Sequence, residues 1–537
     1  MKKIINYLIV LVAVVFTNCE VGNFDLQDDP NRLTPENADT NALLNEMQFL
    51  FQDILADMES NTERLMRYRA LTSSYGDAVS GDILNLEWER FFEVLFISRT
   101  IDNRATSNSD FAFHNGISKL LRAYLTITFV DFNGKIPYEQ AVNVSEFPNP
   151  KLDEGAELYK TALTDITSAI SDINSAAFNV TTDLFYQNDK DKWIAFANTL
   201  KLRILIQAKD AAPEIGMTDL KGEINTLLAS NIIDTPEEDF VYKYAEVPLP
   251  ESRHPYFISG YLPGGFNRYI GNTFMNALIN QKSVRDPRLR YYLYRPTNID
   301  PLTARSSNPY LGCLTVNDFS GICYVGDQYW GLDHGDNLTG RGDNLFRTVY
   351  GIYPGGGAFD EDQKRAAAST SNLAGAGILP ILTSSYVKFL IGEAALTIGT
   401  NGDAKTLLKE AIEASMTKVT TFGGVTSSKA ATTGDIDAYV NEALSNYDAA
   451  SSDNDRLDVV ITELYFAAFG YSIEAYNAYR RTGYPSFINN DPIDVANSIF
   501  PRSFPYALDE VNTNSSITQK ANSDKIFWDK NPDGFIK

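Results

Sequence analysis

The sequence predicts a mainly α-helical protein whose helical scaffold is interrupted by a long loop-rich insertion. Apolar residues recur at steps of three and four positions up to about residue 230, as in amphipathic helices. The same spacing returns after about residue 380, and between these parts Gly, Pro, Asn and Tyr crowd together, as is typical of turns and loops. We therefore expect one domain over residues 34–537, with a scaffold formed by 34–230 and 380–537 and an insertion formed by 231–379.

The chain begins with a segment typical of a bacterial signal peptide. Lys2 and Lys3 precede a short apolar run, which is shorter than the ~20 residues of a membrane-spanning helix. The sequence Phe16-Thr-Asn-Cys19 resembles a lipobox, the signal for attaching lipid to a cysteine. We expect residues 1–18 to be removed, Cys19 to carry the lipid, and residues 19–33 to form a tether at the membrane surface. The alternative is an ordinary signal sequence followed by an unmodified cysteine.

The predicted helices follow the tether. Thr34 suits a helix N-cap and Pro35 suits the first helical position. Later runs with helical spacing lie within residues 113–128, 163–173, 193–204, 386–394 and 457–479. Such helices can stack in pairs as tetratricopeptide-like units, although periodicity by itself leaves that arrangement open.

Two cysteines, Cys313 and Cys323, lie ten positions apart within the insertion. In an oxidising compartment they would close a loop as a disulfide. Two unpaired, buried thiols are the alternative.

Composition argues against several classes of function. The chain has 69 acidic and 46 basic residues, and a net charge of −23 does not suit nucleic-acid binding. Three His and three Cys argue against a zinc or haem site, and no H-E-x-x-H, G-x-S-x-G or P-loop sequence occurs. We therefore expect no catalytic residue, metal or cofactor, while a carboxylate site for Ca²⁺ stays open as the alternative. A glycosidase built on two carboxylates stays open, because so many acids are present.

Several segments carry motifs in a recognisable order. Residues 130–138 read Val130-Asp-Phe-Asn-Gly-Lys-Ile-Pro-Tyr138 and are similar to D-x-x-G-D-I-P-Y, with Lys135 in place of Asp. Residues 191–203 resemble K-W-x-x-x-A-N-x-L-x-x-R. The later motifs are Arg285-Asp-Pro-Arg288, Tyr329-Trp-Gly-Leu-Asp-His-Gly335, Glu474-Ala-Tyr-Asn-Ala-Tyr-Arg-Arg-Thr-Gly-Tyr-Pro485 and Pro501-Arg-Ser-Phe-Pro-Tyr506. In this order they resemble the SusD/RagB family of surface lipoproteins, in particular its starch-binding, outer-membrane-associated branch.

This resemblance implies both a fold and a role. The fold is a scaffold of four tetratricopeptide-like helix pairs, with ligand-binding loops inserted between the helices. The role is a lipid-anchored, surface-exposed protein of the cell outer membrane, which sits as a lid on a TonB-dependent, SusC-like transporter. Members capture oligosaccharides or, in the RagB branch, peptides, without turnover. We expect an oligosaccharide ligand; a peptide ligand and an envelope glycosidase are the alternatives.

The candidate ligand-binding residues have side chains that suit a sugar. Aromatic faces pack against the C–H side of a pyranose, while Asn, Asp and Arg bond its hydroxyl groups. The candidates are Trp88, Tyr256, Tyr261, Tyr269, Tyr291, Asp327, Tyr329 and Trp330. The same loops also supply Phe266, Asn267 and Arg268 as residues of suitable type. Tyr329 and Trp330 lead, because they follow the cysteine pair. The alternative for Trp88 is a core position against the next helix, and for Trp330 a structural place in its family motif.

Overall fold

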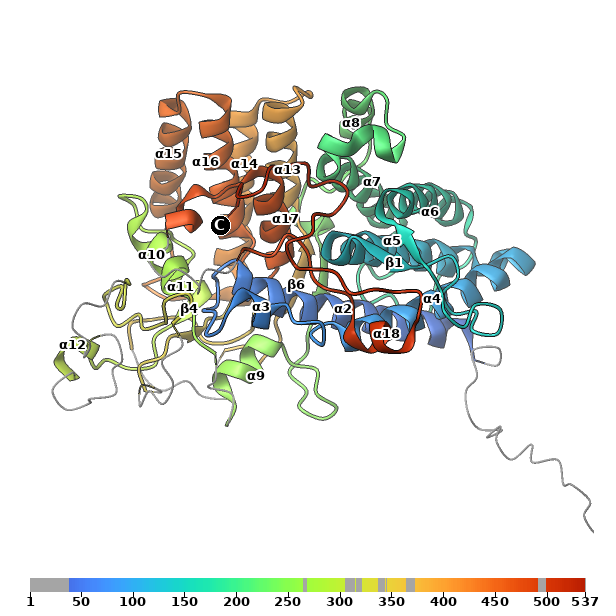
Figure 1. Ribbon diagram of the computed structural model, residues 1–537. Coiled ribbons are helices and arrows are strands. Elements are labelled where there is room, and N and C mark those ends of the chain that lie inside the picture. Colours follow the sequence, from blue (N-terminus) through green and yellow to red (C-terminus); the bar gives the residue numbers. More distant parts are fainter. Residues whose placement is uncertain are drawn as a thin grey trace, which may run out of the picture.

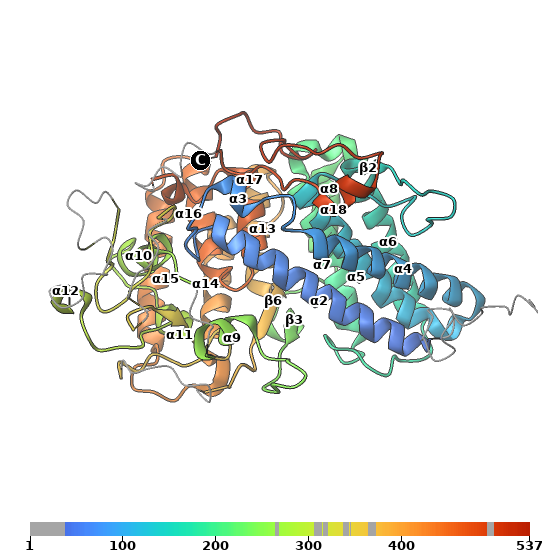
Figure 2. The same ribbon diagram turned by 60° about the horizontal axis from the view of Figure 1, so that its bottom comes forward.

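The computed structural model describes residues 38–263, 268–304, 314, 321–336, 343, 345–363, 372–490 and 499–536. These residues form a mainly helical protein, as the sequence predicts. In Figure 1 the helices within residues 85–228 lie on one side and those within residues 384–467 on the other. Helix α2 (Thr40–Leu65) runs lengthwise across both sides, as Figure 2 shows.

The first half of the scaffold is a succession of helices that pack on their neighbours in sequence. Its α-helices after α2 are α3 (Tyr75–Ala78), α4 (Asn85–Ser107), α5 (Ala112–Asn133), α6 (Gly155–Ser175), α7 (Lys190–Gln207) and α8 (Leu220–Leu228). Short strands β1 (Lys135–Pro137) and β2 (Leu152–Glu154) pair antiparallel between α5 and α6. Helix α5 packs along α6, and every residue of α5 is buried. A helix without an exposed face belongs in the middle of a helical layer.

The second half repeats this arrangement. Its α-helices are α13 (Ser384–Thr397), α14 (Ala404–Thr421), α15 (Thr433–Ala449), α16 (Asp453–Ala467), α17 (Ser472–Thr482) and α18 (Leu508–Thr513). Helix α13 packs against α14 and α16, and α17 packs back on α2. Short 3₁₀ helices occur at Ser109–Phe111, Lys209–Ile215, Pro236–Glu238, Phe422–Gly424 and Ser486–Asn490.

Local sequence explains where many of these helices begin and end. The carboxylate of Asp39 accepts from the N–H groups of Asn41 and Ala42 at the start of α2, and Asp189 caps α7 in the same way. The run of helical spacing over residues 457–479 is not one helix, because the chain breaks between α16 and α17. Gly470 lies in this break with φ +97°, a conformation that favours glycine.

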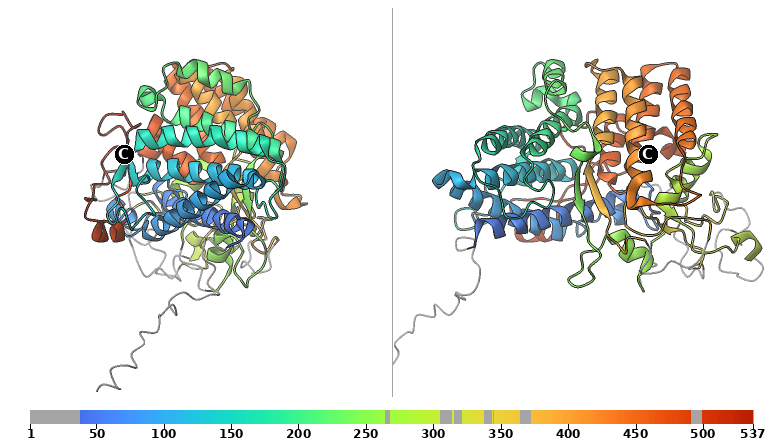
Figure 3. Two further views of the ribbon diagram at one scale, coloured as in Figure 1. Left: turned by 90° about the vertical axis from the view of Figure 1, so that its right-hand side faces the viewer. Right: turned by 180° about the vertical axis from the view of Figure 1, so that it is seen from behind.

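The insertion is closed at its base by a two-stranded antiparallel sheet. Strand β3 (Phe240–Lys243) enters it and β6 (Ile378–Leu382) leaves it, with Phe240 opposite Leu382. Between them lie α9 (Pro255–Tyr261), α10 (Asn272–Asn280), α11 (Leu289–Tyr292), α12 (Pro301–Ala304) and the paired strands β4 (Leu293–Tyr294) and β5 (Val349–Tyr350). These elements gather beside the second half of the scaffold (Figure 3).

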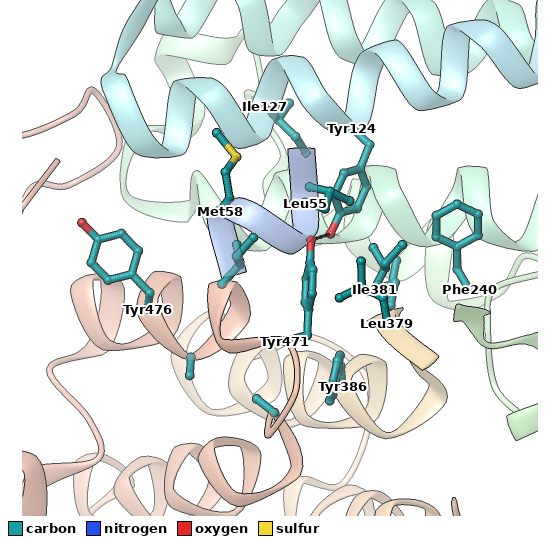
Figure 4. Close-up of a cluster of buried hydrophobic side chains, with 14 of the residues drawn as sticks. Leu55, Met58, Tyr124, Ile127, Phe240, Leu379, Ile381, Tyr386, Tyr471 and Tyr476 are labelled. Atoms are coloured by element: carbon teal, nitrogen blue, oxygen red, sulfur yellow. Dashed lines mark hydrogen bonds between the residues drawn. The ribbon is translucent and has the colours of Figure 1, made fainter. Parts of the chain in front are cut away.

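One large core joins both halves of the scaffold and the base of the insertion. Figure 4 shows Leu55 of α2, Tyr124 of α5 and Phe240 and Ile381 of the β3–β6 sheet around a common centre. The hydroxyls of Tyr124 and Tyr471 are hydrogen-bonded over 2.9 Å inside this core. The insertion is therefore fixed to the scaffold at its two ends.

Buried ion pairs also tie the scaffold together. Arg481 of α17 makes two hydrogen bonds of 2.7 Å to Glu393 of α13, and Lys209 lies 3.0 Å from the same carboxylate. Although burial raises the pKa of Glu393, the two cations outweigh it and lower that pKa to about 2. The pair therefore stays charged at neutral pH.

The predicted signal peptide and tether, including Cys19, Thr34 and Pro35, lie outside the described residues. Within the described part of the chain, no helix combines the length and apolar character needed to cross a bilayer.

Candidate functional site

A small backbone ladder holds the middle of the insertion against the end of α2. The N–H of Ala70 donates to the carbonyl of Tyr269 over 2.9 Å, and the N–H of Leu332 donates to the carbonyl of Ile270 over 3.1 Å. At Gly331 an added Cβ would lie 2.3 Å from that Ile270 oxygen, so this position needs glycine. The segment with Tyr329 and Trp330 is thus placed by main-chain contacts.

Tyr269 lies half-buried at this ladder and is held by charged groups. Its hydroxyl donates to Asp343 over 2.7 Å, and the guanidinium carbon of Arg347 lies 3.9 Å from the centre of its ring. This cation–π contact covers one face of the ring. The indole N–H of Trp330 donates to the other oxygen of Asp343 over 2.9 Å.

Asp327 lies at the surface of the same segment. Its side chain is 39% exposed, and its Oδ2 lies 2.8 Å from Nη1 of Arg295 and 3.3 Å from Nη1 of Arg285. Arg295 is buried, binds Asp360 over 2.6 Å and lies beneath the ring of Tyr329 at 4.6 Å. Asp327 has φ +52°, a left-handed conformation that is uncommon for residues other than glycine. The turn therefore presents an ion pair, Asp327–Arg285, at the surface.

Six of the eight predicted ligand-binding residues are buried, each no more than 4% exposed: Trp88, Tyr256, Tyr261, Tyr291, Tyr329 and Trp330. This burial contradicts the expectation that their rings offer open faces to a sugar. Large aromatic side chains gain most from leaving water. Trp88 takes the core alternative, edge-to-face with Phe129 at 6.4 Å. Trp330 has the structural place that was its alternative, because its indole N–H donates to the carboxylate of Asp343.

The tyrosines of the insertion show the same behaviour. Tyr261 donates its hydroxyl to the carbonyl of Tyr350 over 2.7 Å. Tyr256 stacks on Tyr350 with ring centres 3.8 Å apart. Of the predicted set, Tyr269 and Asp327 are the two that the structure leaves partly open to solvent.

A buried pair of acids on α2 belongs to the same region, and the sequence reasoning did not single it out. The carboxylate of Glu59 accepts from the hydroxyl of Tyr256 over 2.8 Å, and Glu63 accepts from Tyr350 and lies 3.1 Å from Arg69 Nε. Burial, and then the neighbouring Glu63, raise the pKa of Glu59 to about 8. Two acids four residues apart on an otherwise apolar helix face were the available signal.

Cys323 is disulfide-bonded, and the other half of this bond lies outside the described residues, as do Cys313, Phe266 and Asn267. The chain around Cys323 is well fixed. Its N–H donates to Asp333 over 3.0 Å, and the same carboxylate accepts from Asn272 over 2.8 Å.

The cavities of the described surface differ in size. Beside Arg268 and Arg347 there is a cavity of about 10 Å³, which has room for about one water and none for a sugar ring. Larger hollows of about 690 Å³ and about 540 Å³ lie on the scaffold, over α4 and near the start of α14. Among the residues that the structure describes, no group of three or more His, Cys, Asp or Glu side chains is arranged to hold a metal ion.

Comparison with known protein families supports the same fold. Residues 30–312 match the SusD-like family model described as "Starch-binding associating with outer membrane". This match spans more than half of the chain. The chain belongs to the SusD-like family. Residues 340–527 match a second SusD-like model, described as the SusD and RagB outer membrane lipoproteins. A search of curated proteins found no match to this sequence.

Solved structures of SusD-like proteins share the fold over most of their length. A chitin-binding protein has 19% identity and a TM-score of 0.65, with 92% of this chain and 100% of that chain covered. A chitin-binding SusD homologue from Flavobacterium johnsoniae has 17% identity and a TM-score of 0.64, covering 91% and 99%. A SusD-like protein from Bacteroides thetaiotaomicron has 18% identity and a TM-score of 0.65, covering 92% and 100%. The prediction of a helical, tetratricopeptide-like SusD-like fold is confirmed.

Proposed function

We propose that this protein is a non-catalytic surface lipoprotein that binds an oligosaccharide on its insertion and delivers it to a TonB-dependent, SusC-like outer-membrane transporter. The proposed ligand site rests on one observation. Tyr269 and the Asp327–Arg285 ion pair lie on segments of the insertion that are joined by backbone hydrogen bonds. Segment 327–330 links them, because Asp343 binds both Trp330 and Tyr269. Exposed carboxylate and guanidinium groups suit sugar hydroxyls, and the half-buried ring of Tyr269 suits a pyranose ring.

Membership of the SusD-like family supports a glycan ligand. One matching family model carries a starch-binding description, and two of the similar structures are chitin-binding proteins. These relatives share less than 20% identity with this chain, so the glycan itself must come from experiment.

Affinity electrophoresis against starch, chitin derivatives and other neutral glycans tests this proposal. We expect retardation by at least one glycan, and weaker retardation for Tyr269→Ala and Asp327→Ala. The exposed Phe178→Ala, on the scaffold, is the matched control. Migration unchanged on every glycan would contradict the proposal. Incubation with the retarding glycan should release no reducing ends, and release would revive the glycosidase alternative.

A peptide ligand is the second candidate, and one observation favours it. In the part of the insertion that the structure describes, the exposed large apolar side chains are aliphatic: Val247, Leu249, Ile299, Leu302 and Leu345. Aliphatic surface suits apolar peptide side chains better than it suits sugar rings. Mass spectrometry of material that co-purifies with the protein separates the two candidates, since bound peptides and bound glycans differ in mass and composition.

The proposed transporter partner needs its own test. Cross-linking in native outer membranes, followed by affinity purification, should recover a TonB-dependent transporter. Recovery of the protein alone at every cross-linker length would count against delivery to such a partner.

A further inference from the structure

The hollow of about 690 Å³ on the scaffold lies far from the insertion. The second half of α4, the turn that leads into α5 and the loop after β1 form its walls. In Figures 1 and 2, α4 lies at the opposite end of the molecule from α12. Its volume lies within the ~300–1,000 Å³ of typical small-molecule sites. We call it the α4 groove.

The side chains of the α4 groove combine aromatic surface with neutral hydrogen-bonding groups. Phe96 and Phe111 are half-buried in its wall. Beside them lie the amides of Asn103, Asn108 and Asn143. Half-open rings next to amides suit the two sides of a sugar, because the C–H face packs on the ring while the hydroxyl groups bond the amides.

Two cationic side chains of the groove are held in place by carbonyl oxygens of the protein. Arg99 and Arg104 line it, and no carboxylate is among its lining residues. Arg99 donates to the carbonyl of Ala141 over 2.6 Å, and Arg104 donates to the carbonyl of Ala38 over 2.8 Å. These bonds hold the loop after β1 and the entry to α2 against α4. The walls are thereby ordered before a ligand arrives, which lowers the entropic cost of binding.

We infer that the α4 groove is a second saccharide-binding site, which takes an oligosaccharide. Arg99 and Arg104 stay cationic when they bond carbonyl oxygens, so they line the wall as donors for sugar hydroxyl groups, beside the exposed amide of Asn103. The hydroxyls of Thr100 and Ser107 donate to carbonyls of α4 and offer their oxygens as acceptors. The site is separate from the one proposed on the insertion. Through Arg104 it is joined to Ala38, which precedes α2.

Calorimetric titration of the whole protein with chitohexaose and with maltohexaose tests this inference. Three variants are compared with the wild type: Phe96→Ala/Phe111→Ala in the groove, Tyr269→Ala/Asp327→Ala on the insertion, and Phe178→Ala as an exposed control. We expect two sites per chain, one of which weakens at least tenfold in the groove variant alone. Asn103→Ala, an exposed change, should weaken the same site and guards against misfolding of the double variant.

Hydrogen–deuterium exchange of the wild type gives an independent readout. Chitohexaose or maltohexaose should protect residues 96–111 from exchange. Binding that only the insertion variant removes, without protection of residues 96–111, would overturn the inference and leave the proposed function standing. Binding that only the groove variant removes would support the inference and contradict the insertion site. No binding of either probe, or protection by a peptide pool alone, would overturn it.

Discussion

Arg203 of α7 donates from Nε to Oε1 of Glu474 on α17 over 2.6 Å, inside the scaffold. The two side chains are 1% and 4% exposed and come from two different family motifs. Asp131, from a third motif, lies 3.6 Å from the same guanidinium and accepts from the indole of Trp528 over 2.9 Å. These motif residues meet in the core that joins the two halves of the scaffold. Their role is to hold the fold rather than to contact a ligand.

Replacing Arg203 by Met should therefore destabilise the protein strongly. The change leaves the carboxylate of Glu474 buried without its cation, which typically costs about 3–5 kcal/mol. Chemical denaturation measures the free energy of unfolding. Lys160→Met removes an exposed ion pair with Glu157 and should cost less than about 1 kcal/mol. Equal effects of the two changes would contradict this account of the motif.

The buried acid Glu59 should make stability depend on pH. Its pKa is about 8 in the folded protein against an ordinary value of 4.5, so the unfolded state loses a proton that the folded state keeps. Stability therefore falls as pH rises through the window from about 4.5 to 8. Glu59→Gln cannot ionise and keeps an oxygen for the hydroxyl of Tyr256. We expect the free energy of unfolding of this variant, measured relative to that of the wild type, to rise by roughly 1 kcal/mol or more between pH 5 and pH 8.

Urea denaturation at several pH values checks this expectation. His254 is also buried, which lowers its pKa to about 3 and gives a pH dependence of opposite sign. That contribution is common to both proteins and cancels in their difference. A difference between Glu59→Gln and wild type that is the same at every pH would refute the assignment.

Trp330 and Tyr269 should respond differently to truncation. Trp330 is fully buried, so Trp330→Ala should cost about 3–5 kcal/mol of stability. Tyr269 is half-buried, so Tyr269→Ala should cost less stability and weaken glycan binding by about tenfold. Thermal unfolding and glycan titration of both variants check the contrast. Weakened binding without destabilisation in Trp330→Ala would restore its predicted role as an open platform.

The disulfide of Cys323 gives a chemical test of the predicted cysteine pair. Peptide mapping without reduction should recover Cys313 linked to Cys323. Cys323→Ser should leave one reactive thiol at Cys313 and lower the free energy of unfolding by about 2–4 kcal/mol. A linked peptide that contains Cys19 instead would show the predicted pairing to be wrong.

Cys19→Ala tests the predicted anchor. Without the lipid, the protein should move from the membrane fraction to the soluble fraction, because the acyl chains supply the membrane affinity. Cell fractionation with an antibody against the protein measures this. An unchanged membrane fraction would contradict lipid attachment at Cys19.

Sequence periodicity predicted the helices well where one face is apolar, as in α6. The same periodicity predicted α16 and α17 as one helix, because Gly470 interrupts the helix without interrupting the spacing of apolar residues. Sequence also identified the insertion as loop-rich. It did not predict that β3 pairs with β6, since this pairing joins residues far apart in the chain.

The candidate site shows the limit more sharply. Residue type indicated which side chains suit a sugar, and for Tyr269 and Asp327 the structure leaves part of each side chain open. For Tyr256 and Trp330 it does not, because Glu59 and Asp343 supply partners inside the protein. A tyrosine in a Gly-rich loop has the same local sequence whether its ring is buried or exposed.

The sequence by itself determined the helical scaffold, the place of the insertion along the chain and the order of the family motifs, since each of these follows from local spacing. Tertiary structure alone decided which aromatic rings are buried, that Arg203, Glu474 and Asp131 meet, and that a groove opens over α4. The physical reason is that burial and ion pairing depend on contacts between distant segments. Those contacts form only when both halves of the scaffold pack on α2 and on the base of the insertion.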